Sequence, residues 1–328
     1  MATNTINENV EQAILDFGTI KQAIIDKGVE VPSGTPTSQY GAKIGEIQSG
    51  GSSSDDFKGM VERTATEVAL PSDCTKIGDY AFAIYISLTS VDIPKSVTSI
   101  GSYAFQLCKN LALTSLPESV TSINGHAFSE CTKLALTSLP EGITSIGENA
   151  FYGCTNLALT YLPSGITKIL GSTFHGCSNL ALTSLLESVT YIGYSAFSNC
   201  TNLALTSLPS DITSIENYAF NNCVNLSLTS LPDGVTYIGN YAFANCTNLS
   251  LASLPDGVTS IEDYAFRGCT GLTEITFEGT PKTLSSSAFQ GCTNITTIRV
   301  PWAEGEVAGA PWGASNASVV YGYTPETT

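Results

Sequence analysis

The sequence predicts an α/β solenoid of about ten 23-residue coils, with short strands on one face and a small helical segment at the N-terminus. Three columns of residues support this prediction. Phe recurs every 23 residues from Phe82 to Phe289, Cys follows Phe by three residues from Cys108 to Cys292, and Ile precedes nearly every Phe by five. A unit this short cannot enclose a core, so each coil must bury its apolar edge against its neighbours.

Three elements are expected within each repeat. A segment such as VDIP (91–94) or TSLP predicts a short strand closed by Pro, because Pro has no N–H to donate to a sheet ladder. A Gly often follows the Ile, as at Gly147, and predicts a turn with positive φ. The AF-containing segment that follows predicts a short helical turn on the other side of the coil.

The direction of one leucine column stays open at this point. The middle repeats carry Leu eight residues after Phe, whereas flanking repeats carry Val91 and Ile275 nine residues after it. Leucines that point outward would form an apolar stripe wide enough for a protein interface. This column consists of Leu113, Leu136, Leu159, Leu182, Leu205, Leu228 and Leu251.

The repeat resembles the BspA-like class of bacterial leucine-rich repeats. The segment LTSVDIPKSVTSIGSYAFQLCKNL (88–111) and its copies carry the resemblance over about residues 65 to 300. For the fold, the resemblance implies a leucine-rich repeat solenoid. For function, it implies surface recognition and adhesion, with no chemistry attached.

The chain divides into four predicted parts. Residues 1–48 have apolar side chains near helical spacing and predict a helical segment for attachment or oligomerisation. Residues 49–59 are rich in Gly and Ser and predict a flexible linker. Residues 60–300 form the solenoid, and residues 301–328 form a C-terminal cap in which Trp302 and Trp312 cover the last turn.

Two flanking segments resemble parts of phage proteins. IKQAIIDKGVEVPSGTPTSQYGAKIGEI (20–47) is similar to a helical segment near the start of tail and tail-fibre proteins of phages from gut Firmicutes. VPWAEGEVAGAPWGASNASVVYGYT (300–324) is similar to a C-terminal tail on repeat proteins in the same setting. The resemblance implies an attachment module, a receptor-reading solenoid and a terminal cap in a virion.

The cysteine column favours buried free thiols over a redox or metal site. Nine in-register thiols stack with parallel side chains, which is poor geometry for a disulfide, and no CxxC or Cys/His spacing supports zinc. The two histidines, His126 and His175, have no partner in a catalytic arrangement. We therefore expect no catalytic residue, no metal site, no cofactor and no enzymatic activity.

Charge and composition narrow the classes of partner that we expect. The net charge is −16, and Lys and Arg are not clustered, so nucleic acid is not an expected partner. No apolar run approaches the roughly 20 residues of a membrane helix, so membrane insertion is not expected. The N-terminus lacks the features of a secretory signal, which predicts a cytoplasmic start.

The candidate ligand-binding residues lie ten positions after each Phe. A row of hydroxyl groups at ~4.8 Å spacing suits a repeating polymer held by many weak contacts, although small polar residues also keep a strand face soluble. A tyrosine in this row can stack on a sugar ring. The candidates are Asp92, Ser115, Ser138, Tyr161, Ser184, Ser207, Ser230 and Ser253.

The leading functional hypothesis is a non-enzymatic binding protein of a phage tail or fibre. In this hypothesis the repeat face recognises a bacterial surface polymer or protein, and residues 1–48 contact other virion proteins and form a homo-oligomer. Its location is the virion, assembled in the bacterial cytoplasm. The alternatives are a structural or decoration virion protein and an adhesin at the bacterial cell surface.

Overall fold

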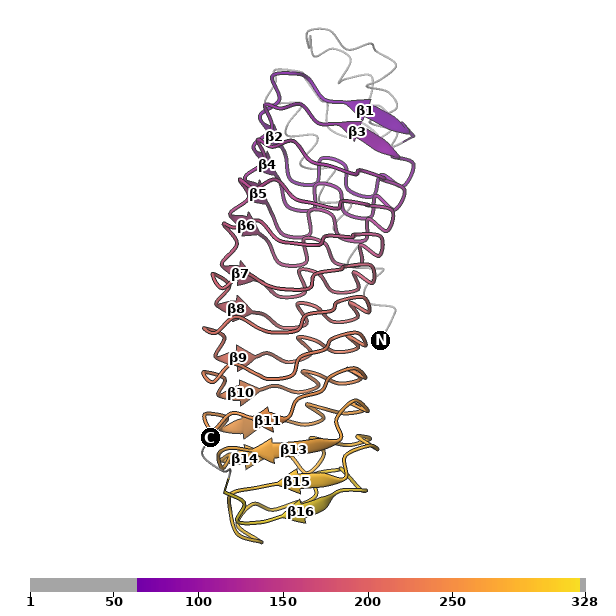
Figure 1. The fold of residues 1–328 in the computed structure, drawn as a ribbon. Coiled ribbons are helices and arrows are strands. Elements are labelled where there is room, and N and C mark those ends of the chain that lie inside the picture. The colour runs from indigo at the N-terminus through magenta and orange to yellow at the C-terminus, as the bar shows by residue number, and fades with distance from the viewer. Residues whose placement is uncertain (1–63, 325–328) are drawn as a thin grey trace, which may run out of the picture.

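A computed structural model describes residues 64–324 as an elongated solenoid of about eleven stacked coils (Figure 1). The predicted helical segment and linker (1–48 and 49–59) lie outside the described residues. The solenoid itself is confirmed, with one coil more than the ten predicted. No helix is present between residues 64 and 324, so the α part of the predicted α/β class is not observed there.

One ladder of parallel two-residue strands runs along an edge of the solenoid (Figure 1). Its strands pair in register with residues 23 positions away, as Ile77 does with Ile100, in the hydrogen-bonded groups β2-β4-β5-β6, β7-β8 and β9-β10-β12-β14. Its members are β2 (Lys76–Ile77), β4 (Ser99–Ile100), β5 (Ser122–Ile123), β6 (Ser145–Ile146), β7 (Lys168–Ile169), β8 (Tyr191–Ile192), β9 (Ser214–Ile215), β10 (Tyr237–Ile238), β12 (Ser260–Ile261) and β14 (Thr283–Leu284).

A second set of parallel strands occurs only near the two ends of the described solenoid. It includes β1 (Glu67–Ala69), β3 (Ser90–Asp92), β11 (Ser253–Leu254), β13 (Glu274–Phe277), β15 (Thr297–Arg299) and β16 (Ser318–Val320). The strand predicted at VDIP is therefore confirmed in part, as β3. In the middle repeats the TSLP segments are not strands, so the predicted strand is wrong there.

The leucine column explains this difference. In the middle repeats the leucines eight and eleven residues after Phe both point inward, as Leu205 and Leu208 do at 0% and 7% exposure. Two consecutive outward residues lie between them, which breaks the alternation that a strand requires. The outward apolar stripe is therefore wrong for Leu136 to Leu251, and only Leu113 is partly exposed.

The segment around each Phe forms a series of hydrogen-bonded turns in place of the expected helical turn. Gln106 donates its N–H to the carbonyl of Tyr103 in its own coil, whereas Leu107 donates to Ser129 in the next coil. Alternate residues thus bond within and between coils. Positive φ values occur two residues before and two after Phe, as at Tyr103 (58°) and Leu107 (61°).

The predicted left-handed turn at the Gly after Ile is wrong. Gly147 has no positive φ and is required for another reason. A Cβ at Gly147 would overlap the backbone of Asn124 and Gly125 in the preceding coil, so the two backbones approach too closely for a side chain.

The interior consists of parallel columns of Phe and Cys. Consecutive Phe rings from Phe82 to Phe289 stack with centroids 5.1–5.7 Å apart and interplanar angles of 2–10°. Each thiol from Cys108 to Cys292 donates to a Phe carbonyl in the preceding coil at 2.9–3.0 Å. All ten cysteines are free, which confirms the prediction of buried thiols for the nine in the column.

The C-terminal end is closed by aromatic side chains. Trp302 and Trp312 are buried at 3% and 0% exposure, and their rings lie 5.2 and 6.0 Å from that of Phe277. β16 adds one more strand to β15, and it pairs at an offset of 21 residues, as Ile298 does with Val319, in place of the 23 of the repeats. The sequence period is therefore lost in this last coil, which is why the repeat columns predict only ten.

Candidate binding surface

The candidate residues form one exposed row that we call the serine face: Asp92, Ser115, Ser138, Tyr161, Ser184, Ser207, Ser230 and Ser253. The structure places one of them on each of eight successive coils. Six are exposed, and Ser138 and Ser253 are partly exposed. In the middle coils the row projects outward because the residues eight and eleven positions after Phe point into the core and leave the two positions between them on the surface, whereas Asp92 is exposed by the alternation of strand β3.

The two ends of the row differ from its middle. Asp92 lies in β3, beside Ala69 of β1. Ser253 donates its hydroxyl to Glu278 Oε1 at 2.6 Å, so this hydroxyl already has a partner. The serines between residues 115 and 230 belong to the coils without a strand in this segment, and they provide the regular part of the row.

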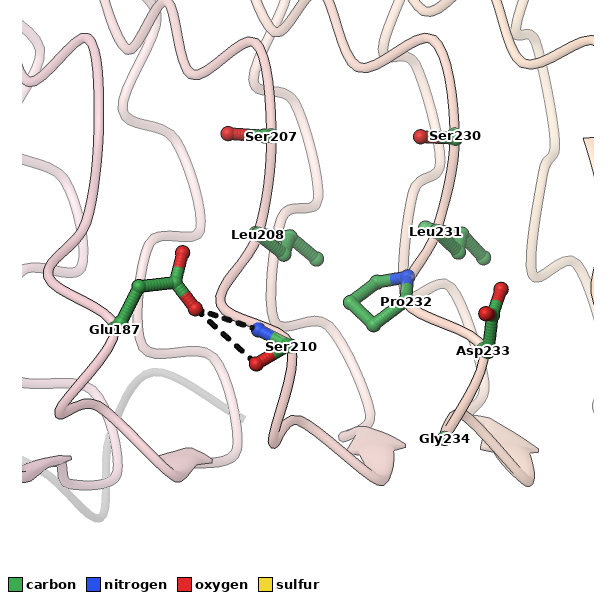
Figure 2. Close-up of a pocket in the computed structure, with 9 residues that line it drawn as sticks. All are labelled: Glu187, Ser207, Leu208, Ser210, Ser230, Leu231, Pro232, Asp233 and Gly234. Carbon is green, nitrogen blue, oxygen red and sulfur yellow. Dashed lines mark hydrogen bonds between the residues drawn. The ribbon is translucent and has the colours of Figure 1, made fainter.

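A hollow of about 420 Å³ lies on the serine face, across three neighbouring coils. Ser207 and Ser230 stand along it, and the largely buried Leu208 and Leu231 provide apolar lining (Figure 2). Ser210, Pro232 and Gly234 complete the turn side of the hollow. The serine face is thus hollowed where two of the predicted hydroxyl groups are adjacent.

Two carboxylates give the hollow its charge. Glu187 accepts hydrogen bonds from the backbone N–H and the hydroxyl of Ser210 at 3.0 and 3.2 Å, and Asp233 lies two coils further on (Figure 2). No basic side chain lines the hollow. Its hydroxyl and carboxylate oxygens can accept hydrogen bonds from the hydroxyl or ammonium groups of a ligand, whereas an anionic ligand would be repelled.

Sequence reasoning missed Glu187 and Ser210 as parts of this surface. A carboxylate recurs thirteen residues after Phe at Glu118, Glu141 and Asp233, after a Pro in each case. Glu187 occupies the same position but follows Leu186, so it lacks the preceding Pro that the other three share. The recurrence of an acidic residue at intervals of 23 positions, or multiples of 23, is the sequence signal that identifies Glu187.

Two exposed apolar side chains extend the surface toward the N-terminus. Tyr161 in the serine row is 46% exposed, and Leu186 in the next coil is 37% exposed. Leu186 replaces the Pro that most repeats carry at this position. The middle of the serine face therefore offers an aromatic ring and an aliphatic side chain next to the hydroxyl-lined hollow.

The titratable groups with shifted pKa values lie outside the serine face. Burial lowers the pKa of His126, although Glu148 opposes this shift, and burial also lowers the pKa of His175. The two rings stack on Tyr103 and Tyr152 at 4.5 and 4.7 Å, which accounts for both histidines as parts of surface stacks. Burial raises the pKa of the column thiols from Cys131 to Cys292, for example that of Cys292 to about 12, so they remain protonated near neutral pH.

Two further properties hold for residues 64–324. No three or more His, Cys, Asp or Glu side chains come together in an arrangement that could hold a metal ion. This stretch also contains no helix with the length and apolar character needed to cross a membrane.

Comparison with known proteins identifies the repeat family. Residues 57–181 and 171–296 match the family model described as BspA type leucine-rich repeat region, six copies. The chain belongs to this family. The match confirms the leucine-rich repeat resemblance.

Several solved structures are similar to this chain, and one of them has a TM-score above 0.5. The pneumococcal vaccine antigen PcpA matches with a TM-score of 0.52 and 19% identity, covering 77% of each chain. A leucine-rich cell surface protein of Faecalibacterium prausnitzii matches with a TM-score of 0.41 and 24% identity, covering 73% of this chain and 89% of that one. A leucine-rich repeat protein of Bacteroides ovatus gives 0.37 and 24%, with coverages of 78% and 91%. No curated protein matches the chain.

Proposed function

We propose that this protein is a non-enzymatic adhesin whose serine face binds an extended polymer at a bacterial surface. The observation that carries the proposal is the in-register exposure of one polar side chain per coil over eight coils. A polymer with a similar repeat can meet these groups one after another. Contacts that are individually weak then add to a useful avidity.

The charge of the surface narrows the polymer to a neutral or basic one. Glu187 and Asp233 line the hollow, and Glu118, Glu141 and Asp256 occupy the same position in other coils. A phosphate-rich polymer would meet this acidic column without a compensating cation in the hollow. A neutral glycan would find hydroxyl and carboxylate partners, with Tyr161 available to stack on a sugar ring.

Membership in the BspA-type family supports a location at the bacterial cell surface, since recognition and adhesion are what this class implies. The virion location predicted from the flanking segments stays a prediction. Residues 20–47 lie outside the described residues, and residues 300–324 close the solenoid. Immunofluorescence on intact cells and mass spectrometry of purified phage particles distinguish the two locations.

The binding experiment uses the full chain against a glycan array and purified bacterial cell walls. We expect the triple variant Ser184→Ala, Ser207→Ala and Ser230→Ala to bind roughly 100-fold less tightly, because each of the three lost hydrogen bonds contributes about 1 kcal/mol. The matched control replaces serines of the strand ladder, Ser99, Ser122 and Ser145, with Ala. Equal binding by both triple variants, or binding to no surface polymer, would refute the proposal.

A further inference from the structure

Four tyrosines on successive coils form a continuous aromatic row on the surface. Tyr218, Tyr241 and Tyr264 lie two residues before the Phe of their coil, and Tyr194 lies three residues before it. The ring centroid of Tyr218 lies 5.8 Å from that of Tyr194 and 5.1 Å from that of Tyr241. The centroids of Tyr241 and Tyr264 are 4.9 Å apart. Each ring is thus at contact distance from the next, and we call the four residues the tyrosine strip.

Tyr194 is the most accessible member of the strip. It is 53% exposed, whereas the other three are partly exposed. The rings of Tyr218 and Tyr241 are parallel within 6°, whereas Tyr194 meets Tyr218 edge to face at 68°. The preceding coil has Gly171 at the position of Tyr194, and a Cβ at Gly171 would have only the Tyr194 carbonyl oxygen within 4 Å, at 3.6 Å. No side chain at that position covers Tyr194, so the strip is open at this end.

The opposite end of the strip carries a cation from the chain itself. The guanidinium carbon of Arg267 lies over the Tyr264 ring, 5.9 Å from its centroid. This distance is within the roughly 6 Å over which the face of an aromatic ring attracts a cation. The Arg267 side chain is exposed, so this contact forms at the surface. One ring of the strip therefore already binds a guanidinium group.

The strip lies in a segment of the chain without Lys or Arg. Neither residue type occurs from residue 169 to residue 266, and all four tyrosines lie within this range. A segment with acidic residues and no basic ones attracts a basic partner and repels an acidic one. The acidic residues of the segment are Glu187, Asp211, Glu216, Asp233, Asp256, Glu262 and Asp263.

Three of these acidic residues belong to the same turns as the rings. Glu216 and Glu262 each lie two residues before a tyrosine of the strip, and each carboxylate accepts a hydrogen bond from the serine two residues before it, at 2.8 and 2.5 Å. Asp263 is exposed, and its backbone carbonyl accepts the N–H of Tyr241 at 3.1 Å. The strip therefore combines aromatic rings with carboxylates held by the fold.

We propose that the tyrosine strip is an interaction surface for a basic polypeptide, with an arginine side chain of the partner against the open side of Tyr194. Arginine suits this surface better than lysine, because its planar guanidinium stacks on aromatic rings. Tyrosine and arginine are also enriched among the residues that contribute most to protein interfaces. The serine face lies ten residues after Phe and the strip lies two or three residues before it, so this surface does not depend on the function proposed for the serine face.

Binding of labelled peptides to the full-length protein tests the proposal. The probes are oligoarginine, oligolysine and oligoglutamate peptides of equal length, measured by fluorescence anisotropy. We expect oligoarginine to bind at least roughly twofold more tightly than oligolysine, because only the guanidinium groups stack on the rings. Oligoglutamate should not bind, and added salt should weaken the binding of both basic peptides.

Variants locate the surface on the solenoid. Tyr194→Asn should weaken oligoarginine binding roughly two- to fivefold, which is the effect of one exposed cation–π contact. This variant keeps the fold because the next two coils carry Asn217 and Asn240 at the equivalent position. The matched control Tyr103→Ser removes a ring from a separate surface stack, where it lies 4.7 Å from Tyr80, and Ser occupies this position in other coils. The control should bind oligoarginine as the wild-type protein does.

Three results would overturn the proposal. One is equal affinity of the wild-type protein for oligoarginine and oligolysine, and another is unchanged oligoarginine binding in Tyr194→Asn. The third is binding of a neutral chitin oligosaccharide more tightly than oligoarginine, with loss of that binding in Tyr194→Asn, which would assign the strip to a glycan. An unchanged oligoarginine affinity in the serine-face triple variant would support two separate surfaces, so the failure of one proposal is distinguishable from the failure of the other.

Discussion

Replacing Phe197 with Ala tests whether the phenylalanine column couples the coils into one cooperative unit. Phe197 is fully buried near the middle of the column, with ring centroids 5.7 and 5.6 Å from those of Phe174 and Phe220. Truncating a buried Phe to Ala costs about 3–5 kcal/mol. Part of this cost comes from two stacked contacts, each contributing about 0.5–1.5 kcal/mol.

The position of the change determines how unfolding proceeds. In a solenoid each coil contacts only its neighbours, so a weak central interface separates the molecule into two halves. Phe82→Ala removes an equivalent ring from the first coil of the column and should lower the free energy of unfolding without dividing the rest. The comparison therefore separates lost burial from lost coupling.

Two spectroscopic signals follow the two parts of the molecule during urea unfolding. Both tryptophans, Trp302 and Trp312, are buried at the C-terminal end, so fluorescence reports on the last coils. Far-UV circular dichroism reports on the whole chain. We expect the two transitions to coincide in Phe82→Ala and to separate in Phe197→Ala. Coincident transitions in Phe197→Ala, with a loss below about 1 kcal/mol, would refute the reasoning.

Three further predictions concern the interior. In the native protein a thiol reagent at pH 8 should modify only Cys74, because the other nine thiols are buried, and reaction of several column thiols in the native state would contradict the fold. The free energy of unfolding should fall steeply above about pH 8.5–9, by up to about 1.4 kcal/mol per pH unit for each buried thiol. The reason is that burial raises the thiol pKa values in the folded state, so above this pH the unfolded chain binds fewer protons than the folded one. An unchanged free energy of unfolding between pH 8 and pH 10 would contradict this prediction. Gly147→Val should destabilise by more than about 2 kcal/mol, whereas Gly78→Ala, with no atom within 4 Å, should change thermal unfolding little.

Particular residues show where sequence reasoning succeeded. The 23-residue period of Phe and Cys predicts a solenoid, buried rings and free thiols, and each of these follows from the stacking of near-identical coils. The same period places Ser115 to Ser230 on successive coils. Their exposure follows only from the direction of the two leucines on either side, and the sequence leaves that direction open.

Other features required the folded structure. The strand was expected at TSLP, but in the middle repeats the dipeptide that ends in Ile forms the strand instead. Gly147 was expected at a turn with positive φ, and it is needed instead for close approach of two backbones. The series of turns beside Phe contains residues with positive φ, such as Tyr103 and Leu107, and neither residue type predicts this conformation.

The sequence by itself determined the repeat, the columns that fill the interior and the family, because a strict period forces equivalent residues into equivalent environments. Tertiary structure decided which segments pair, which leucines point inward and which surface side chains meet. Contacts such as Ser210 with Glu187, or Tyr237 with Asn217, join different coils, and their geometry depends on how each coil is placed on the next. That placement results from packing of the whole stack, which no single repeat contains.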